Sequence, residues 1–299
     1  MKRCLRCDCR FDGLGWRCPN CAFAPVIVDG LPCFAPELAP EHIGFDASRY
    51  EVLAKVEAHH FWFRSRVELV VWALRRHFSQ AKSLLEIGCG TGEVLAAIAR
   101  TDSLRRLVGS EAHLAGLALA ARRAPTAELL QSDARCIPFR DEFDVIGAFD
   151  VIEHVDEDEQ ILREMFAACR PGGGIVVTVP QHEWLWSYRD EFAGHQRRYR
   201  REDLLGKIAA AGFERPWSTS FVTLLLPVMA LSRAGQKAPE GFAASGELQV
   251  GRVMNRILGA VMNAERRLIA TGVSLPVGGS LLAIAHKPEL HGTGAAALP

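Results

Sequence analysis

The chain has 299 residues, of which 49% are hydrophobic and 23% are charged, so it can bury a substantial core and is not a disordered polypeptide. Its 35 basic and 35 acidic residues give a formal net charge of zero, which excludes a globally basic nucleic-acid-binding protein. No run reaches the roughly 18 unbroken apolar residues that a membrane-spanning helix requires.

Six of the nine cysteines lie within the first 35 residues, and this crowding indicates metal binding rather than disulfides. The four that have the spacing of two knuckles around a tetrahedral ion are Cys4, Cys7, Cys18 and Cys21. Four thiolates leave no open coordination position, so the sequence predicts a structural zinc ion. The segment resembles a zinc ribbon. Cys9 is a spare thiol that could replace Cys7, and a metal-free cysteine-rich tail is the alternative.

No apolar signal segment separates Met1 from the first cysteines, so we expect a reducing, cytoplasmic location. After a module over residues 1–35, prolines and small residues predict a linker over 36–48. The main domain is expected over 49–288 and a flexible tail over 289–299. The main domain opens with apolar residues at helical spacing over 50–78, which predict one or two helices.

Beyond residue 80, short apolar runs alternate with helical stretches, the pattern of a parallel sheet with crossover helices. The expected strands cover 83–87, 106–110, 127–130, 143–149 and 174–179. The expected helices cover 93–100, 113–123 and 158–170. This order predicts a doubly wound α/β sheet whose ligand crevice lies at the carboxyl ends of the strands.

The first of these strands runs into the glycine-rich turn Glu86-Ile-Gly-Cys-Gly-Thr-Gly92, and the second ends at Glu111. Glycines let the backbone approach a ligand closely, and an acid at the second strand end can accept ribose hydroxyls. A dinucleotide needs a helix start that is free for pyrophosphate, but here Glu93 would repel it. S-adenosylmethionine has no phosphate and a positive sulfonium, so the turn favours that cofactor, with Glu86 near its cationic methionine end.

Three segments resemble the class I S-adenosylmethionine-dependent methyltransferases over residues 50–287. They are Leu84-Leu-Glu-Ile-Gly-Cys-Gly-Thr-Gly92, Phe143-Asp-Val-Ile-Gly-Ala-Phe-Asp-Val-Ile-Glu-His-Val155, and the stretch over 162–174 with its Arg170-Pro-Gly-Gly turn. The resemblance implies a Rossmann-like, mostly parallel sheet of seven strands. It also implies cofactor binding by Glu86, Gly88, Cys89, Gly90, Gly92, Glu111, Asp133, Ala134 and Phe149. Glu111 occupies a position that is often aspartate, and its longer side chain still reaches a ribose.

The chain is also similar to a bacterial subgroup that has a His60-Phe-Trp-Phe-Arg64 helix and a loop from Trp184-Leu-Trp186 to Gly194-His-Gln-Arg-Arg-Tyr199. That similarity implies a small-molecule or surface-glycan acceptor. Because methyl transfer is a direct displacement, a general base is optional. If one is used, the candidates near the strand ends are His154, His182 and His195. The segment over 181–201 is interpreted as a substrate lid with contacts from Tyr188, Asp190 and Arg198, although its arginines also fit a solvated helix start.

The last third predicts a sixth strand over 214–221, an amphipathic helix over 248–269 and a final strand over 280–286. In the resembling fold the last two strands form a hairpin, so residues 222–272 are interpreted as an insertion. It could cover an apolar acceptor, dock a dimer partner, rest on a membrane surface as a peripheral contact, or add core packing. The oligomeric state stays open.

The leading hypothesis is methyl transfer to a small-molecule, glycan-linked or lipid-linked acceptor. A ribosomal RNA base methyltransferase that holds RNA with its zinc module is a second hypothesis, and the missing basic stripe weighs against nucleic acid as a partner. The third hypothesis is a catalytically silent zinc- and S-adenosylmethionine-binding interaction protein. The intact turn and acidic positions argue against it.

Overall fold

The computed structural model describes residues 1–38, 47–101, 104–233 and 250–289. Parts of three expected segments therefore lie outside the described residues. These are positions 39–46 of the linker, 234–249 of the insertion and 290–299 of the tail. The first two residues of the helix expected over 248–269 lie outside as well.

Seven strands build the centre of one sheet. They are β5 (Ser83–Ile87), β6 (Arg106–Glu111), β7 (Glu128–Gln131), β8 (Phe143–Phe149), β9 (Cys169–Pro180), β10 (Glu214–Phe221) and β11 (Ser280–His286). Their spatial order is β7-β6-β5-β8-β9-β11-β10, and β11 is antiparallel to both of its neighbours. The other pairs are parallel. The predicted doubly wound fold is confirmed, and the chain order reverses between β5 and β8, where such folds bind ligands.

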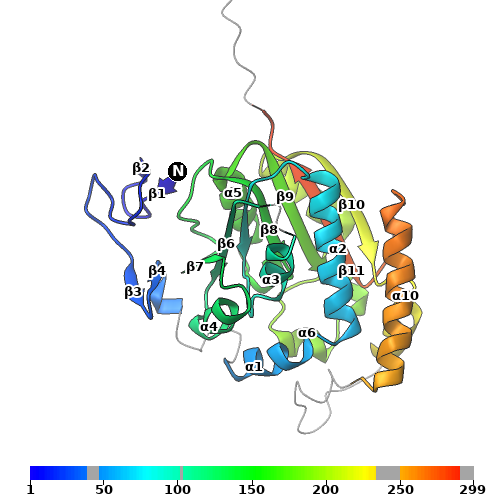
Figure 1. The fold of residues 1–299 in the computed structure, drawn as a ribbon. Coiled ribbons are helices and arrows are strands. Elements are labelled where there is room, and N and C mark those ends of the chain that lie inside the picture. The colour runs from blue at the N-terminus through cyan, green and yellow to red at the C-terminus, as the bar shows by residue number, and fades with distance from the viewer. Residues whose placement is uncertain (39–46, 102–103, 234–249, 290–299) are drawn as a thin grey trace, which may run out of the picture.

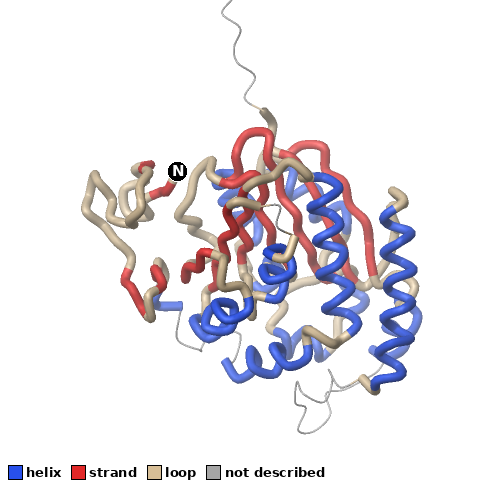
Figure 2. Tube along the Cα trace, viewed as in Figure 1, coloured by secondary structure: helices blue, strands red, loops and turns tan. Residues whose placement is uncertain are grey.

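Helices cover both faces of the sheet (Figures 1 and 2). They are α1 (Ala47–Val56), α2 (Phe61–His77), α3 (Glu93–Ala99), α4 (Leu114–Arg123), α5 (Asp158–Ala168), α6 (Tyr188–Ala193), α7 (Arg201–Ala210), α8 (Leu226–Arg233) and α10 (Arg252–Ala270). Single 3₁₀ turns are η1 (Pro36–Leu38), η2 (Ile152–His154) and η3 (Glu183–Leu185). The helices α2, α3, α4 and α10 share one apolar cluster, and α5 and α7 share the other.

Helix α2 shows how the sequence pattern sets the packing. Phe63, Val67 and Val70 recur at helical spacing and are buried, so they form the face that packs on the sheet. The His60 side chain accepts a hydrogen bond from the Trp62 amide at 3.2 Å and caps the start of the helix. The stretch expected as one or two helices is therefore two, α1 and α2.

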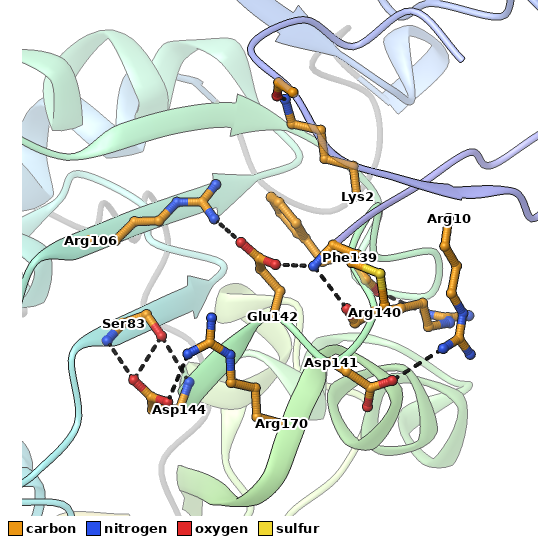
Figure 3. A network of polar contacts seen from close by, with 12 residues as sticks. Lys2, Arg10, Ser83, Arg106, Phe139, Arg140, Asp141, Glu142, Asp144 and Arg170 are labelled. Carbon is orange, nitrogen blue, oxygen red and sulfur yellow. Dashed lines mark hydrogen bonds and ion pairs between the residues drawn. The ribbon is translucent and has the colours of Figure 1, made fainter. Parts of the chain in front are cut away.

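The N-terminal segment is docked on the main domain. The hairpin of β3 (Val26–Val28) and β4 (Leu31–Cys33) adds to the edge of the sheet beside β7, which brings the sheet to nine strands. Ahead of it, β1 (Lys2–Arg3) pairs with β2 (Arg10–Phe11). The Met1 amino group pairs with the Glu142 carboxylate. Figure 3 shows that Arg106 contacts the same carboxylate and that Arg10 pairs with Asp141, at 3.3 Å. The first residues of the module thus pack near the strand starts, whereas β4 and the residues that follow it contact Gln131 at the carboxyl end of β7, on the side of the expected crevice.

The boundary between α5 and β9 differs from the sequence expectation. The helix was expected to reach residue 170 and the strand to start at 174, but α5 ends at Ala168 and β9 begins at Cys169. Pro171 cannot continue a helix, and Gly172 has φ +78°. A register shift between Phe143 and Val145 of β8 accommodates the extra residues of β9.

The described part of the insertion folds back on the domain through a buried acid. Glu265 of α10 accepts hydrogen bonds from the Val222 amide at 2.6 Å and the Leu224 amide at 2.7 Å, so α10 is fixed to the end of β10. Figure 1 shows α10 beside α2, with which it packs. Among the described residues, no helix has the length and apolar character needed to cross a bilayer.

Candidate active site

A cavity of about 810 Å³ lies at the carboxyl ends of β5, β6, β7 and β8. Its walls come from the turn after β5, the loops after β6, β7 and β8, helices α1 and α2, and the residues after α6. All nine predicted cofactor residues except Gly92 line it. Polar residues at the ends of successive strands therefore line one cavity, as the sequence predicted for the crevice.

The glycine turn has a backbone shape that requires glycine. Gly88 and Gly92 have φ values of +64° and +79°, a region that other residues rarely adopt. A Cβ on Gly88 would lie 2.5 Å from Val151 Cγ2, and one on Gly92 would lie 2.7 Å from the Ala120 Cα. Gly92 does not line the cavity itself, and its role is to let α3 begin close against α4.

Glu86 is almost completely buried at the end of β5, beside the turn. Its Oε2 atom has no hydrogen-bond partner among the described residues. Burial raises the pKa of this carboxyl well above its usual range, against the attraction of Arg66. A buried acid with an unsatisfied oxygen at a cavity wall fits a ligand that carries an ammonium group, which is the methionine end of S-adenosylmethionine.

Glu111 ends β6 and is anchored on both carboxylate oxygens. Oε2 accepts a hydrogen bond from the Gly90 amide at 2.9 Å, while Oε1 accepts from the His113 amide at 3.1 Å and the Tyr50 hydroxyl at 3.3 Å. A carboxylate has about four acceptor positions, so capacity remains for ribose hydroxyls. The same Glu111 contact raises the pKa of Tyr50, although burial is the larger cause.

Asp133, after β7, takes part in an ion-pair network that the sequence did not predict. Its carboxylate pairs with Arg135 at 2.8 Å, and Arg135 also pairs with Glu157 at 3.1 Å. Ala134 and Phe149 lie on the same cavity wall. Asp150 follows Phe149 with φ +57° and is paired with Arg66 of α2. These residues give this end of the cavity a charged rim and an apolar wall.

Two imidazoles lie at the other end of the cavity. His154 of η2 and His195, after α6, have ring centroids 4.8 Å apart. Burial, with a contribution from His195, lowers the pKa of His154 to about 4, so this imidazole is neutral near pH 7. His195 Nδ1 lies 3.0 Å from Asp190 Oδ1, which orients the ring. Two of the three predicted catalytic histidines are thus brought together.

The other lid residues that the sequence predicted for the site do not line the cavity; they are His182, Tyr188, Asp190 and Arg198. His182 stacks on Trp184 with centroids 5.5 Å apart. Tyr188 begins α6, and Arg198 is buried with its Nη2 2.6 Å from Asp190 Oδ1. Asp190 acts from behind His195 and also pairs with Arg233 at 3.2 Å. The substrate contacts expected from Tyr188, Asp190 and Arg198 stay predictions, and the described geometry gives Asp190 and Arg198 a supporting position instead.

Several residues that shape the site were missed at the level of sequence. Tyr50, Glu57 and Arg66 reach the cavity from α1 and α2, about 20 to 40 residues ahead of the glycine turn. Glu153 is fully buried between Asp150 and the two imidazoles, and neither of its carboxylate oxygens has a hydrogen-bond partner among the described residues. The adjacent Glu153 and His154 in the segment over 143–155 were the available signal.

The four predicted zinc ligands converge, far from this cavity. The Cys4 and Cys21 sulfurs lie 3.5 Å apart, and those of Cys7 and Cys18 lie 3.6 Å apart. Sulfurs around a tetrahedral ion with Zn–S bonds of about 2.3 Å would be about 3.8 Å apart. All four sulfurs lie within 4.8 Å of one another, so they fit the ion.

The two knuckles also share a backbone pattern. The residue after each second cysteine, Asp8 and Ala22, has a positive φ, and its amide donates back to the carbonyl of the first cysteine of its own pair. Cys9 lies next to Cys18, but its sulfur is not in the group of four that are mutually within 4.8 Å, and it donates to the Arg10 carbonyl oxygen at 3.6 Å. The geometry thus favours Cys7 over the spare thiol.

With this geometry established, comparison with known proteins identifies the family. A family model described as a methyltransferase domain matches residues 43–215, more than half of the chain. The chain belongs to this methyltransferase family. The family that the sequence predicted is therefore confirmed.

Curated relatives of the methyltransferase differ in their named acceptors. A probable S-adenosylmethionine-dependent methyltransferase of Mycolicibacterium smegmatis is 31% identical over 52% of this chain and 60% of its own length. A phthiotriol/phenolphthiotriol dimycocerosates methyltransferase of Mycobacterium ulcerans is 27% identical over 59% of this chain and 63% of its own. A tRNA (guanine-N(7)-)-methyltransferase of Rubrobacter xylanophilus is 28% identical over 46% of this chain and 67% of its own. The alignment thus spans less than two thirds of the first two relatives.

Solved structures agree on the fold. A phosphoethanolamine N-methyltransferase of Haemonchus contortus, solved with S-adenosylmethionine, superposes with a TM-score of 0.56 at 16% identity. The superposition covers 87% of this chain and 61% of that one. At this identity the likeness shows the methyltransferase fold alone.

Proposed function

We propose that this methyltransferase acts on a small molecule, or on the accessible end of a glycan-linked or lipid-linked molecule. The observation that carries the proposal is the continuity of one cavity from Gly88 and Glu111, at the cofactor end, to His154 and His195 at the other. The two ends come from distant parts of the chain, so the cavity can hold a cofactor and an acceptor side by side.

The chain's own groups fit the cofactor at several points. The unsatisfied Glu86 oxygen faces the ammonium end, Glu111 accepts from the ribose, and Phe149 gives the apolar floor. S-adenosylmethionine supplies, when bound, a methyl group on a positively charged sulfur. The protein's contribution is orientation, because holding the two reacting atoms in line can replace much of the barrier of a bimolecular displacement. His154 and His195 are the groups assigned to contact the acceptor.

The size and charge of the cavity support a small acceptor group. About 810 Å³ lies within the usual range for ligand pockets, and the cofactor takes a large share of it. Acidic residues are prominent among the lining residues and outnumber the arginines: they are Glu57, Glu86, Glu93, Glu111, Asp133, Asp150, Asp156 and Glu157, compared with Arg66 and Arg135. This charge repels a polyanion, which weighs against RNA although one relative is named for tRNA.

An exposed apolar surface supports a lipid-linked acceptor as one member of this class. Leu224, Val228 and Leu231 recur at helical spacing around α8, and Met254 and Ile257 are exposed on α10. The exposed side of α10 also carries arginines, whereas its one acid, Glu265, is buried. Apolar residues flanked by arginines are typical of helices that lie on anionic membranes.

We further infer that zinc is a structural ion in the Cys4, Cys7, Cys18 and Cys21 cluster. Support comes from the sulfur separations and from the matching knuckles, and the site closes with four protein ligands. We assign the cluster a structural role rather than a part in the chemistry of methyl transfer, because none of its four cysteines lines the cavity.

A transfer assay with radiolabelled S-adenosylmethionine tests the proposed function. The full-length protein is incubated separately with small-molecule, lipid and RNA fractions, and label is expected in one of the first two. Glu86→Gln should reduce incorporation, whereas the surface variant His59→Gln should not. Label in RNA alone would reverse the proposed acceptor class. If calorimetry detects no binding of S-adenosylmethionine at millimolar concentration, the protein is not a methyltransferase that uses this cofactor.

A further inference from the structure

Beside the acceptor end of the cavity, Glu153, His154 and His195 form a cluster whose polar atoms are not explained by cofactor binding. One ligand-type atom from each lies within 4.8 Å of those of the other two. His195 Nε2 is 4.0 Å from Glu153 Oε1, too far for a hydrogen bond. Glu153 is 0% exposed, and neither of its oxygens has a hydrogen-bond partner among the described residues. Such a carboxylate is costly to bury unless something positive meets it.

Both imidazoles have an outer hydrogen bond that leaves the second ring nitrogen available. His195 Nδ1 pairs with Asp190 Oδ1 at 3.0 Å, which directs Nε2 toward Glu153. His154 is hydrogen-bonded to the Gly194 backbone. Metal-binding histidines in proteins almost always use one nitrogen for the ion and the other for a carboxylate or a backbone carbonyl. This pair shows both kinds of partner.

Asp190 is itself held rigidly, which fixes the orientation of His195. It is 1% exposed and accepts from Arg198 Nε at 2.8 Å, and it also pairs with Arg233 at 3.2 Å. Within α6 it closes a capping box with Ser187. These contacts hold the Asp190 carboxylate in one position, and Asp190 in turn fixes the His195 imidazole beside the cavity.

We propose that Glu153, His154 and His195 bind one divalent first-row transition-metal ion, which contacts the acceptor of the methyl group. Two imidazoles and one carboxylate suit Zn²⁺, Fe²⁺, Co²⁺ or Mn²⁺, whereas Mg²⁺ and Ca²⁺ prefer oxygen ligands. Donor atoms around a tetrahedral ion with bonds of about 2.0–2.1 Å lie about 3.4 Å apart. The donor atoms of the three residues lie within 4.8 Å of one another, and His195 Nε2 is 4.0 Å from Glu153 Oε1, so the side chains need to move closer together to hold an ion. Three protein ligands leave a coordination position open, and His154 and His195 line the cavity.

The ion specifies the acceptor chemistry, and this step rests on the proposed function. A Lewis acid lowers the pKa of a coordinated hydroxyl, so the acceptor atom is an oxygen. The hydroxyl proton passes to water, and an oxygen electron pair forms the bond to the methyl carbon. The electron pair of the breaking carbon–sulfur bond returns to sulfur. The products are a methyl ether and the neutral thioether.

The test measures metal binding directly, without an acceptor. Full-length, zinc-loaded protein is titrated with Mn²⁺ alone, followed by electron paramagnetic resonance, and with Co²⁺ alone, followed by visible absorption. The four-cysteine cluster selects softer ions, so it contributes little to the Mn²⁺ signal. We expect one equivalent of Mn²⁺ to bind, with an affinity at least tenfold lower in Glu153→Gln and His195→Gln and unchanged in His59→Gln.

Two further readouts keep the outcome decisive. S-adenosylmethionine binding by each variant confirms that it is folded, and His154→Gln replaces any variant that is not. Equal Mn²⁺ and Co²⁺ affinities in the wild type and in two folded variants would overturn the proposal, as would no binding of either ion at millimolar concentration. If the ion binds and no methyl transfer is found, the proposed function fails and the metal site stands.

Discussion

The Gly90 amide donates a hydrogen bond to Glu111 Oε2 at 2.9 Å, which ties the glycine turn after β5 to the end of β6. One carboxylate therefore holds the turn and is also the group that we propose to accept from the cofactor ribose. Removing it should loosen both parts of the cofactor site at once.

Glu111→Ala is expected to weaken S-adenosylmethionine binding. Loss of a charged hydrogen-bonding group costs about 1.5–3 kcal/mol, which corresponds to a roughly 10- to 150-fold rise in Kd. Calorimetry on the purified protein measures this. Glu128→Gln, which alters an exposed acid at the start of β7, is the matched control and should leave Kd unchanged. An unchanged Kd in Glu111→Ala would show that the ribose is held elsewhere.

Gly88→Ala should destabilise the fold, because its Cβ would lie 2.5 Å from Val151 Cγ2 at a φ of +64°. The left-handed backbone and the overpacking together are expected to cost about 2–4 kcal/mol. Urea unfolding gives the free energy. Adding Val151→Ala should recover the part due to the steric contact and leave the backbone part. No recovery in the double variant would mean that the clash with Val151 is not the cause.

The paired variant Cys18→Ser with Cys21→Ser should lose its metal, as measured by elemental analysis, while Cys9→Ser should retain it. Cofactor affinity should also fall, roughly two- to tenfold, the range for residues that act on a site without touching it. The coupling path is the Gln131 side chain, whose Nε2 donates to Ala35 at 2.6 Å and to Ala112, beside Glu111, at 2.9 Å. Unchanged cofactor affinity after complete metal loss would mean that the module is energetically separate. A metal-free, folded wild type would refute the zinc assignment itself.

Asp158→Asn should make the free energy of unfolding depend less on pH in the acid range. Burial raises the pKa of Asp158, but hydrogen bonds from Lys207 and from Tyr199, at 2.7 Å, outweigh burial and lower it below its usual value. A lowered folded pKa contributes stability above the unfolded pKa of about 3.9. That stability is lost as the pH falls through the folded value.

The Asp158→Asn variant should therefore be about 1–3 kcal/mol less stable at pH 7 and nearly equal to the wild type once the pH falls below the folded pKa of Asp158. Urea unfolding across this pH range is the measurement. The exposed variant Asp156→Asn serves as its control, since Asp156 is 80% exposed. A difference between Asp158→Asn and the wild type that is independent of pH would show that the ionised form of Asp158 is not the stabilising one.

The sequence alone predicted the seven central strands of the sheet and a set of polar strand ends that the structure brings together. Short apolar runs and apolar residues at helical spacing are local patterns, and they located β5, β8, β10 and β11 at their observed bounds. The glycine turn and the acid at the end of β6 belong to single strand ends, so the fold brings them together by topology. The cysteine spacing likewise fixed a four-sulfur cluster.

Only the tertiary structure decided which residues from other segments reach the cavity. Tyr50 and Arg66 come from helices ahead of the sheet, and their positions depend on how α1 and α2 pack. Several polar residues of the lid were equally good candidates for a substrate contact from the sequence. In the structure Asp190 and Arg198 pair with each other in the interior, and His195 faces His154. Such orientations depend on long-range contacts and buried ion pairs, which no local sequence pattern encodes.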